Sequence, residues 1–302
     1  MPDIRRPTLL LTALVISTAL VSLAPAQGTP AATPPTTAPR AILFRLVENT
    51  ASVEGTLDGP TTARRWTPGE SLGPLARQQI EAMVKATVLG PTGKLGAATI
   101  GGRIETNDPC DWVRETRYLT TVKTVFPAHA LSAPWNPVPR PITALPLNSA
   151  SYLAIVSAEL KKRGLTAAPR LVQLLRTDLD GNGRDDILMV AASDPVTFRE
   201  GIMNGIYANR AGQYSLVLVR EALPNGVKTS VLGERIFKVA PLPDAFPEML
   251  TQRIGAVADL NGDGSMEVLL DDYVHEGEGT TVWQSSAGKA TMKRVLEWGC
   301  GV

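Results

Sequence analysis

Residues 178–186 read DLDGNGRDD, and residues 259–267 read DLNGDGSME. The two stretches align without a gap, with oxygen-bearing side chains at positions 1, 3, 5 and 9, glycine at positions 4 and 6, and leucine at position 2. Calcium takes about six to eight oxygen ligands, and a tight loop brings alternate side chains to one centre. The repeated pattern therefore predicts two calcium sites of the same design.

The expected ligands follow from the spacing. Glycine at position 6 allows the sharp turn, the backbone carbonyl at position 7 supplies one ligand, and the carboxylate at position 9 closes the far side. Magnesium fits less well, because it prefers ideal octahedral geometry and retains its waters. The predicted metal ligands are Asp178, Asp180, Asn182, the Arg184 carbonyl and Asp186 in the first loop, and Asp259, Asn261, Asp263, the Ser265 carbonyl and Glu267 in the second.

Strands are expected on both sides of each loop, because the flanking residues are apolar runs. Position 12 is Met189 or Leu270, whereas the helix–loop–helix calcium motif needs a glutamate there. Each loop is therefore expected in the bend of a β-hairpin. The same residues would also allow Asp-Gly and Asn-Gly hairpin turns without metal, although such turns need no acid at position 9. The flanking runs are 171–175 and 187–190, then 254–257 and 268–270.

The two predicted hairpins resemble the calcium loops of FG-GAP (VCBS-type) repeats, which occur in integrin α-chain propellers and in many exported bacterial proteins. The resemblance covers Leu171 to about Val302 and implies the same ten ligands. The Phe-Gly and Gly-Ala-Pro elements that name the repeat are absent, and only two loops occur. We therefore expect two hairpins that resemble propeller blades, rather than a complete propeller.

The remaining pattern predicts a mainly β fold with one or two helices (α+β). Apolar spacing predicts helices over 75–89 and 151–163, the second ending at Gly164. Residues 90–102 are expected to form loops or short strands, and the proline-rich residues 127–146 an irregular connection in which His129 has no partner in view. Strands are expected over 41–49, 51–57, 118–126, 171–176, 187–192, 214–220, 230–239, 253–258, 268–272, 280–284 and 291–296.

The N-terminus has the pattern of a secretory signal peptide over residues 1–26. Arg5 and Arg6 precede an apolar stretch, and Ala24-Pro25-Ala26 offers the small residues of a cleavage site. An uncleaved anchor is the alternative, but the stretch from Leu9 to Leu23 is short for a membrane core of about 30 Å. We further expect a Pro/Thr/Ala linker over 27–40, an N-terminal β-rich subdomain over 41–147 and the FG-GAP-like domain over 148–302.

Composition limits the class of partner. The 302 residues are 44% hydrophobic and carry a net charge of +1, so no cationic surface for nucleic acid is expected. Two histidines and two cysteines leave little material for zinc, copper or iron–sulfur sites. In an exported chain, Cys110 and Cys300 predict one disulfide, and two unrelated thiols are the alternative.

These patterns together predict an exported, non-enzymatic calcium-binding protein in which calcium is structural. It would be secreted or reside in the periplasm or cell envelope, with no stable membrane span after cleavage. A binding or adhesion module with a protein or glycan ligand at the cell surface is one form of this function. The alternative is a secreted hydrolase acting on a sugar or phosphate substrate, with His275 as base and acids drawn from Asp272, Glu276 and Glu278.

Overall fold

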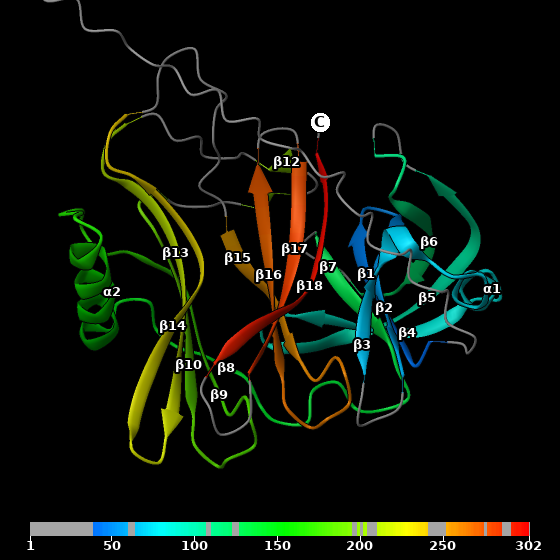
Figure 1. The fold of residues 1–302 in the computed structure, drawn as a ribbon, viewed down its shortest axis with the longest axis horizontal. Coiled ribbons are helices and arrows are strands. Elements are labelled where there is room, and N and C mark those ends of the chain that lie inside the picture. Colours follow the sequence, from blue (N-terminus) through cyan, green and yellow to red (C-terminus); the bar gives the residue numbers. More distant parts are fainter. Residues whose placement is uncertain are drawn as a thin grey trace, which may run out of the picture. The chain divides into compact units, whose positions relative to one another are not determined.

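In a computed structural model of the chain, the structure describes residues 39–59, 64–106, 110–122, 127–194, 198–199, 202–203, 210–240, 252–274, 277–285 and 291–301. The predicted signal peptide and nearly all of the predicted linker lie outside these residues. Residues 34–302 form one compact unit, and the predicted boundary between residues 147 and 148 stays a prediction. The described residues are mainly β, with two α-helices, as the sequence predicts (Figure 1).

The first part of the chain forms a closed six-stranded barrel. Its strands are β1 (Ala41–Val47), β2 (Thr50–Asp58), β4 (Val84–Gly90), β5 (Gly93–Thr106), β6 (Arg114–Thr120) and β7 (Ala128–Ser132). They pair in the order β1-β7-β4-β5-β6-β2, and β1 pairs with β2 to close the barrel. The short strand β3 (Arg65–Pro68) adds to β2, and η1 (Gly69–Ser71) and α1 (Pro74–Glu81) follow it. The barrel encloses a core that includes Ile42, Phe44, Leu46 and Val53.

Two open sheets follow the barrel. One contains β8 (Thr143–Ala144), β9 (Leu171–Thr177), β10 (Asp186–Ala192), β13 (Gln213–Leu223) and β14 (Gly226–Phe237), in the order β14-β13-β10-β9-β8. The other, called the central sheet below, contains β15 (Gln252–Ala258), β16 (Glu267–Val274), β17 (Gly277–Ser285) and β18 (Met292–Gly301) in sequence order. The helix α2 (Ala150–Lys162) lies between β8 and β9 in the chain, and β11 (Phe198–Arg199) pairs with β12 (Ile202–Met203).

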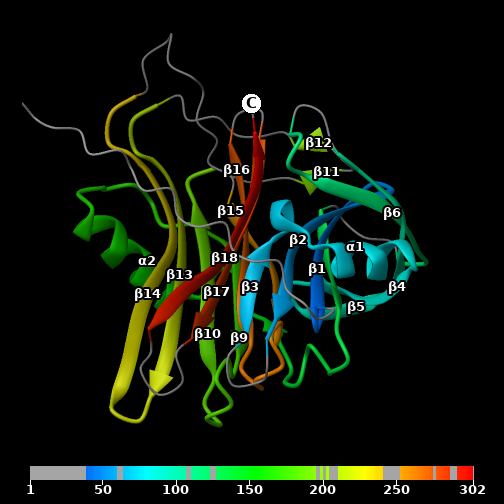
Figure 2. The same cartoon turned by 45° about the vertical axis from the view of Figure 1, so that its right-hand side comes forward.

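The central sheet packs against its neighbours on both faces, most completely at β15. On one face, Ala256 and Leu269 pack with Leu43 and Leu131 of the barrel. On the other face, Val257 and other residues pack with the β9–β10–β13 part of the neighbouring sheet, whose far side is covered by α2. Figure 2 shows the central sheet between the barrel strands and the β13–β14 sheet. This double burial explains why every residue of β15 is buried.

The strands predicted after residue 170 are all present. The predicted helix over 151–163 is confirmed as α2, and Gly164 follows it in the left-handed conformation with a φ of 77°. The described residues form a closed barrel and open sheets, and no propeller is found among them.

The strand predicted over 118–126 is found as β6, which begins at Arg114 and ends at Thr120, while residues 123–126 lie outside the described residues. Three other predicted segments differ more from the structure. The helix predicted over 75–89 ends at Glu81, because Met83 has a φ of 68° and the alternating buried residues Val84, Ala86 and Val88 then join the barrel as β4. Residues 90–102 are predicted as loops or short strands, and residues 93–106 form one long strand instead. The connection predicted over 127–146 contains β7, because β1 and β4 both pair with residues 129–131.

A disulfide joins Cys110, just before β6, to Cys300 in β18, as the sequence predicts. It ties the barrel to the central sheet across 190 residues of chain. Cys110 is fully buried and packs with Val113 and Trp298. Among the described residues, no helix is both long and apolar enough to cross a membrane.

Opening this disulfide should lower the free energy of unfolding. In the chain-entropy model a loop of this length contributes up to roughly 5 kcal/mol, and removal of native disulfides commonly costs about 2–5 kcal/mol. Urea denaturation with and without reductant measures the difference. The Cys110→Ser/Cys300→Ser variant should match the reduced protein and be insensitive to reductant. Equal midpoints for oxidised and reduced wild type would contradict the stabilising role.

Candidate functional site

The two acidic loops occupy the bends of two β-hairpins. The first connects β9 to β10, which pair antiparallel, and the second connects β15 to β16 in the same way. Both hairpins were predicted from the sequence and both are confirmed. Their glycines at positions 4 and 6 all have left-handed backbone, with φ of 74° and 81° at Gly181 and Gly183 and of 72° and 89° at Gly262 and Gly264. A side chain at these positions would be strained, which explains the glycines.

In the first loop, carboxylates accept hydrogen bonds from the loop's own backbone. The Asp178 carboxylate accepts from the N–H groups of Gly181, Asn182 and Gly183, at 2.8, 3.1 and 2.9 Å. Asp186 Oδ2 accepts from the Leu179 N–H at 2.9 Å. These bonds turn the carboxylates of positions 1 and 9 toward each other. Carboxylate oxygens of Asp178, Asp180 and Asp186 lie within 4.8 Å of one another.

The second loop repeats this hydrogen-bonding scheme. Asp259 accepts from the N–H groups of Gly262 and Gly264, at 2.6 and 3.1 Å, and Glu267 Oε2 accepts from the Leu260 N–H at 2.7 Å. In both loops position 1 therefore accepts from positions 4 and 6, and position 9 accepts from position 2. The side chains of positions 3 and 5 also accept from the backbone two residues ahead in each loop.

The loops differ at one predicted ligand. In the second loop, the Asn261 Nδ2 group lies between two carboxylates and donates to Asp263 Oδ2 at 3.0 Å and to Glu267 Oε1 at 2.9 Å. Its Oδ1 accepts from the backbone. Asp263 and Glu267 thus flank the Asn261 amide nitrogen, while the Asn261 oxygen faces the backbone. The ligand roles of all ten residues, the Arg184 and Ser265 carbonyls included, remain predictions.

Burial makes these carboxylates hard to ionise. Glu267 is fully buried, and burial together with the neighbouring charges of Asp263 and Asp259 raises its pKa well above the usual range. Burial also raises the pKa of Asp259, and it raises the pKa of Asp186 to about 6 despite hydrogen bonds from the backbone. Crowded, partly desolvated carboxylates of this kind are stabilised by a nearby cation.

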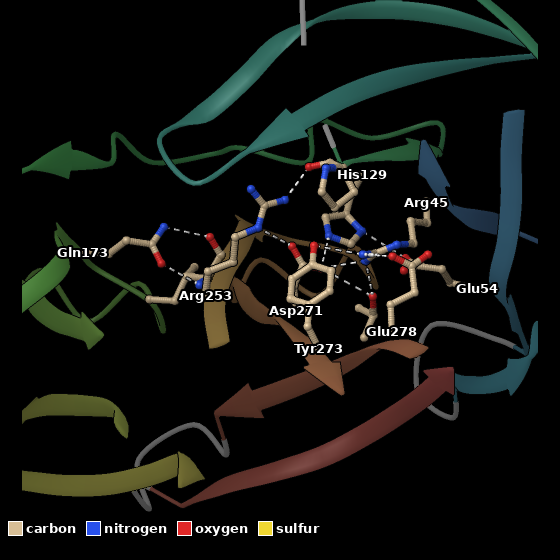
Figure 3. Close-up of polar contacts among 11 residues, drawn as sticks. Arg45, Glu54, His129, Gln173, Arg253, Asp271, Tyr273 and Glu278 are labelled. Atoms are coloured by element: carbon tan, nitrogen blue, oxygen red, sulfur yellow. Dashed lines mark hydrogen bonds and ion pairs between the residues drawn. The ribbon is translucent and has the colours of Figure 1, made fainter. Parts of the chain in front are cut away.

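A second polar feature was missed by sequence reasoning. Charged side chains from the barrel and from the central sheet meet in a buried cluster between them (Figure 3). We call it the charge cluster; its members are Arg45, Glu54 and His129 from the barrel, and Arg253, Asp271, Tyr273, Glu278 and Thr280 from the central sheet.

Asp271 is the centre of the charge cluster. Its Oδ1 lies 2.9 Å from Arg45 Nη1 and 2.9 Å from His129 Nε2, and its Oδ2 accepts from Arg253 Nε at 2.7 Å. Although burial alone would raise the pKa of Asp271, the three cationic groups lower it far below its usual range. Asp271 is therefore a carboxylate at all ordinary pH values.

The Arg45 guanidinium donates hydrogen bonds to four side chains. Besides Asp271, it donates to Thr280 Oγ1 at 3.1 Å, to the Tyr273 hydroxyl at 3.0 Å and to Glu278 Oε2 at 2.8 Å. The rings of Tyr273 and Trp298 lie 5.5 and 5.9 Å from its guanidinium carbon. A fully buried arginine is tolerated when its charge is paired, and here both terminal nitrogens of Arg45 are bonded while its Nε has no hydrogen-bond partner among the described residues.

His129 has a carboxylate at each ring nitrogen. Nδ1 lies 3.0 Å from Glu54 Oε2, and Nε2 lies 2.9 Å from Asp271. Carboxylates accept hydrogen bonds and do not donate them, so both nitrogens carry hydrogen and the ring is an imidazolium. Burial by itself would lower the pKa of His129, but the charges of Glu54 and Asp271 outweigh it and raise the pKa to about 9.

Strand register builds the charge cluster. Arg45 is directly opposite His129 across β1 and β7, and Asp271 is opposite Arg253 on one side and Thr280 on the other. Gly255 forms a bulge on β15, and a Cβ there would lie 2.5 Å from Asp271 Oδ2 and 2.6 Å from His129 Nε2. The missing side chain of Gly255 thus leaves the space in which His129 reaches Asp271.

The charge cluster has a structural geometry. His129 and Asp271 have no exposed surface, and both ring nitrogens of His129 and both carboxylate oxygens of Asp271 face oppositely charged partners. A proton donor or nucleophile must reach its substrate. The arrangement instead fixes how the barrel packs on the central sheet.

The acids suggested for a hydrolase are held by arginines. Arg235 Nη2 donates to both oxygens of Asp272, at 3.0 and 2.9 Å, and Glu278 belongs to the charge cluster. His275 and Glu276 lie outside the described residues.

Comparison of the chain with protein families, with curated proteins and with solved structures gave no match in any of the three.

The charge cluster predicts a loss of stability at alkaline pH. The folded pKa of His129, about 9, exceeds the unfolded value near 6.5, so its contribution is complete below about pH 6.5 and is lost as the pH rises through about 9. The full effect is roughly 3 kcal/mol. Urea denaturation from pH 6 to 10 would measure it. In His129→Gln the fall over this window should be smaller; an identical pH profile would contradict the assignment.

The clearance at Gly255 is a separate prediction. Gly255→Ala places a methyl group against buried Asp271 and His129, and we expect destabilisation of about 2–4 kcal/mol, the range for a disrupted buried ion pair or an overpacked site. Thermal unfolding measures the shift. Gly212→Ala is a control for a glycine with open space around it, although its φ of 84° carries its own strain. The alanine at 255 should cost clearly more.

Proposed function

We propose that this protein is an exported calcium-binding protein in which two calcium ions stabilise the hairpin bends beside the central sheet. The observation that carries the proposal is the repeated loop: in both bends, the carboxylates of positions 1 and 9 accept the same backbone hydrogen bonds. In the first bend three carboxylates also converge within 4.8 Å. Two hairpin turns without metal would have no reason to share this scheme down to the acid at position 9.

The donor set favours calcium over other metals. The predicted ligands are carboxylate, amide and backbone oxygens, which suit a hard cation. Each loop has three acids at its predicted ligand positions. In the first loop, oxygens of Asp178, Asp180 and Asp186 lie within 4.8 Å of one another, which concentrates negative charge there. Asp185, the one further acid of the first loop, pairs instead with Arg176. A divalent cation would supply the missing positive charge.

A structural role fits the position of the loops. Leu179 and Leu260, at position 2 of each loop, are fully buried in the cores on opposite faces of the central sheet, and Met266 is buried beside Leu179. A bound ion would therefore fix the backbone from which these core residues project. Protein groups fill the predicted ligand positions, and such sites contribute folding energy rather than chemistry.

Export is proposed from the N-terminal pattern and is supported by the disulfide. Disulfides persist in oxidising compartments outside the cytosol. We propose a secreted or envelope location, and a protein or glycan at the cell surface as the ligand class. The ligand class rests on the resemblance to integrin-type calcium loops. The hydrolase is the weaker proposal, because Asp272 and Glu278 are each neutralised by an arginine.

Calcium should raise the thermal stability of the mature protein. A ligand at one hundred times its Kd adds about 2.7 kcal/mol per site. Calorimetry with excess calcium and with a chelator should therefore give clearly different melting temperatures. Asp178→Ala/Asp259→Ala should abolish the difference. Asp185→Asn removes an acid that points to Arg176 and should leave the difference intact.

Two results would contradict the proposed function. Melting curves that coincide with and without calcium would exclude a structural ion. A calcium effect that survives Asp178→Ala/Asp259→Ala would place the ion elsewhere.

A further inference from the structure

One segment of the chain contacts both acidic loops. Residues 133–142 run from the end of β7 to the start of β8, and we call them the strap. No sequence pattern connects this proline-rich segment with the loops. In the structure, the strap presents one side chain and one stretch of backbone to each of them.

At the second loop, the strap holds position 1. Trp135 Nε1 donates to the Asp259 carbonyl at 2.8 Å, and the Asp259 N–H donates to the Pro137 carbonyl at 2.7 Å. Both backbone groups of the residue that begins the loop are therefore bonded to the strap. Arg64 lies over the Trp135 ring, with 5.2 Å between its guanidinium carbon and the ring centre.

At the first loop, the strap also bonds the backbone of position 1, which is Asp178. Arg140 donates from Nε to the Asp178 carbonyl and from Nη2 to the Leu179 carbonyl, the latter at 2.8 Å. The Thr177 hydroxyl donates to the Pro141 carbonyl at 2.9 Å. In each loop, the backbone carbonyl of position 1 thus accepts a hydrogen bond from a side chain of the strap.

The glycines at position 4 also face the strap. A Cβ at Gly262 would lie 2.8 Å from the Trp135 ring, and a Cβ at Gly181 would lie 3.3 Å from Arg140 Nη1. The strap therefore fits closely against the bend of both loops, more tightly at the second.

The loops are also bonded to each other. The Met266 N–H, at position 8 of the second loop, donates to the Leu179 carbonyl, at position 2 of the first, at 2.7 Å. The same carbonyl accepts from Arg140. A movement of the backbone at Leu179 would thus disturb hydrogen bonds to the strap and to the second loop.

We propose that Trp135 and Arg140 couple the two loops, so that calcium bound in one raises the affinity of the other. This inference rests on the proposed function. An ion that fixes the backbone of position 1 in one loop also fixes the strap residues bonded to it, and the strap then holds the other loop in its binding conformation. The second ion loses less conformational freedom on binding, which is positive cooperativity.

The test is a mutant cycle read by calcium titration calorimetry of the mature chain. Asp178→Ala disables the first loop, and the affinity of the second loop should then fall at least about fivefold, the lower end of usual coupling. In the Arg140→Met background, Asp178→Ala should leave the affinity of the second loop unchanged. Trp135→Phe keeps an aromatic ring but removes the hydrogen bond to the Asp259 carbonyl. It should reduce the coupling between the loops as Arg140→Met does.

A control and a spectroscopic readout complete the test. Arg176→Met is the control, because Arg176 lies beside the first loop but pairs with Asp185 and not with the strap. The coupling between the loops should persist in this variant. Terbium occupies calcium sites and emits when a nearby tryptophan absorbs light. Terbium emission excited through tryptophan should report filling of the second loop and fall in Trp135→Phe, with Trp283, which pairs with Val268, as the remaining donor near this loop.

The outcomes separate the two proposals. No calcium uptake by the wild type would overturn the proposed function. Uptake at two independent sites would overturn the coupling and leave the function standing. Coupling that persists in both Arg140→Met and Trp135→Phe would show that the strap does not carry it.

Discussion

The Asp271 carboxylate is the contact on which the packing of the barrel against the central sheet depends. Its partners are Arg45 and His129 from the barrel and Arg253 from its own sheet. Removing an ion from water costs several kcal/mol unless a partner compensates it. The charge cluster holds three cations and three anions, counting His129 as an imidazolium, and so its charges balance. Any other docking of the two sheets would leave some of these charges unpaired.

Apolar packing alone would not specify that docking. Leu43 and Leu131 meet small and aliphatic residues of the central sheet, and such contacts tolerate displacement. The charge cluster adds direction, because hydrogen bonds between Arg45 and Asp271 depend on geometry. We infer that the hydrophobic contact supplies most of the energy and the charge cluster supplies the register. The disulfide between Cys110 and Cys300 secures the same interface covalently.

Local features of this fold could be predicted, and long-range ones could not. The hairpin bends were predictable because acids, asparagine and glycine stand at fixed spacing within nine residues and the flanking runs are apolar. The charge cluster was not, because Arg45 and Asp271 are 226 residues apart and no pattern in one sequence pairs them. Residues 84–90 continue a helical spacing, and only pairing with β5 and β7 makes them a strand. Gly255 shows its role only once His129 and Asp271 are placed around it.

The charge cluster and the acidic loops deal with the same electrostatic problem in two ways. Inside the molecule, Asp271 is compensated by cations that the chain itself provides, so the interface needs no ligand. At the hairpin bends, Arg140 and Arg184 donate to backbone carbonyls instead of to the loop acids, and the pKa values of Asp186 and Glu267 are raised. Arginines that approach a group of carboxylates without pairing with them leave its negative charge available. This contrast is the physical reason why we propose an external cation for the loops.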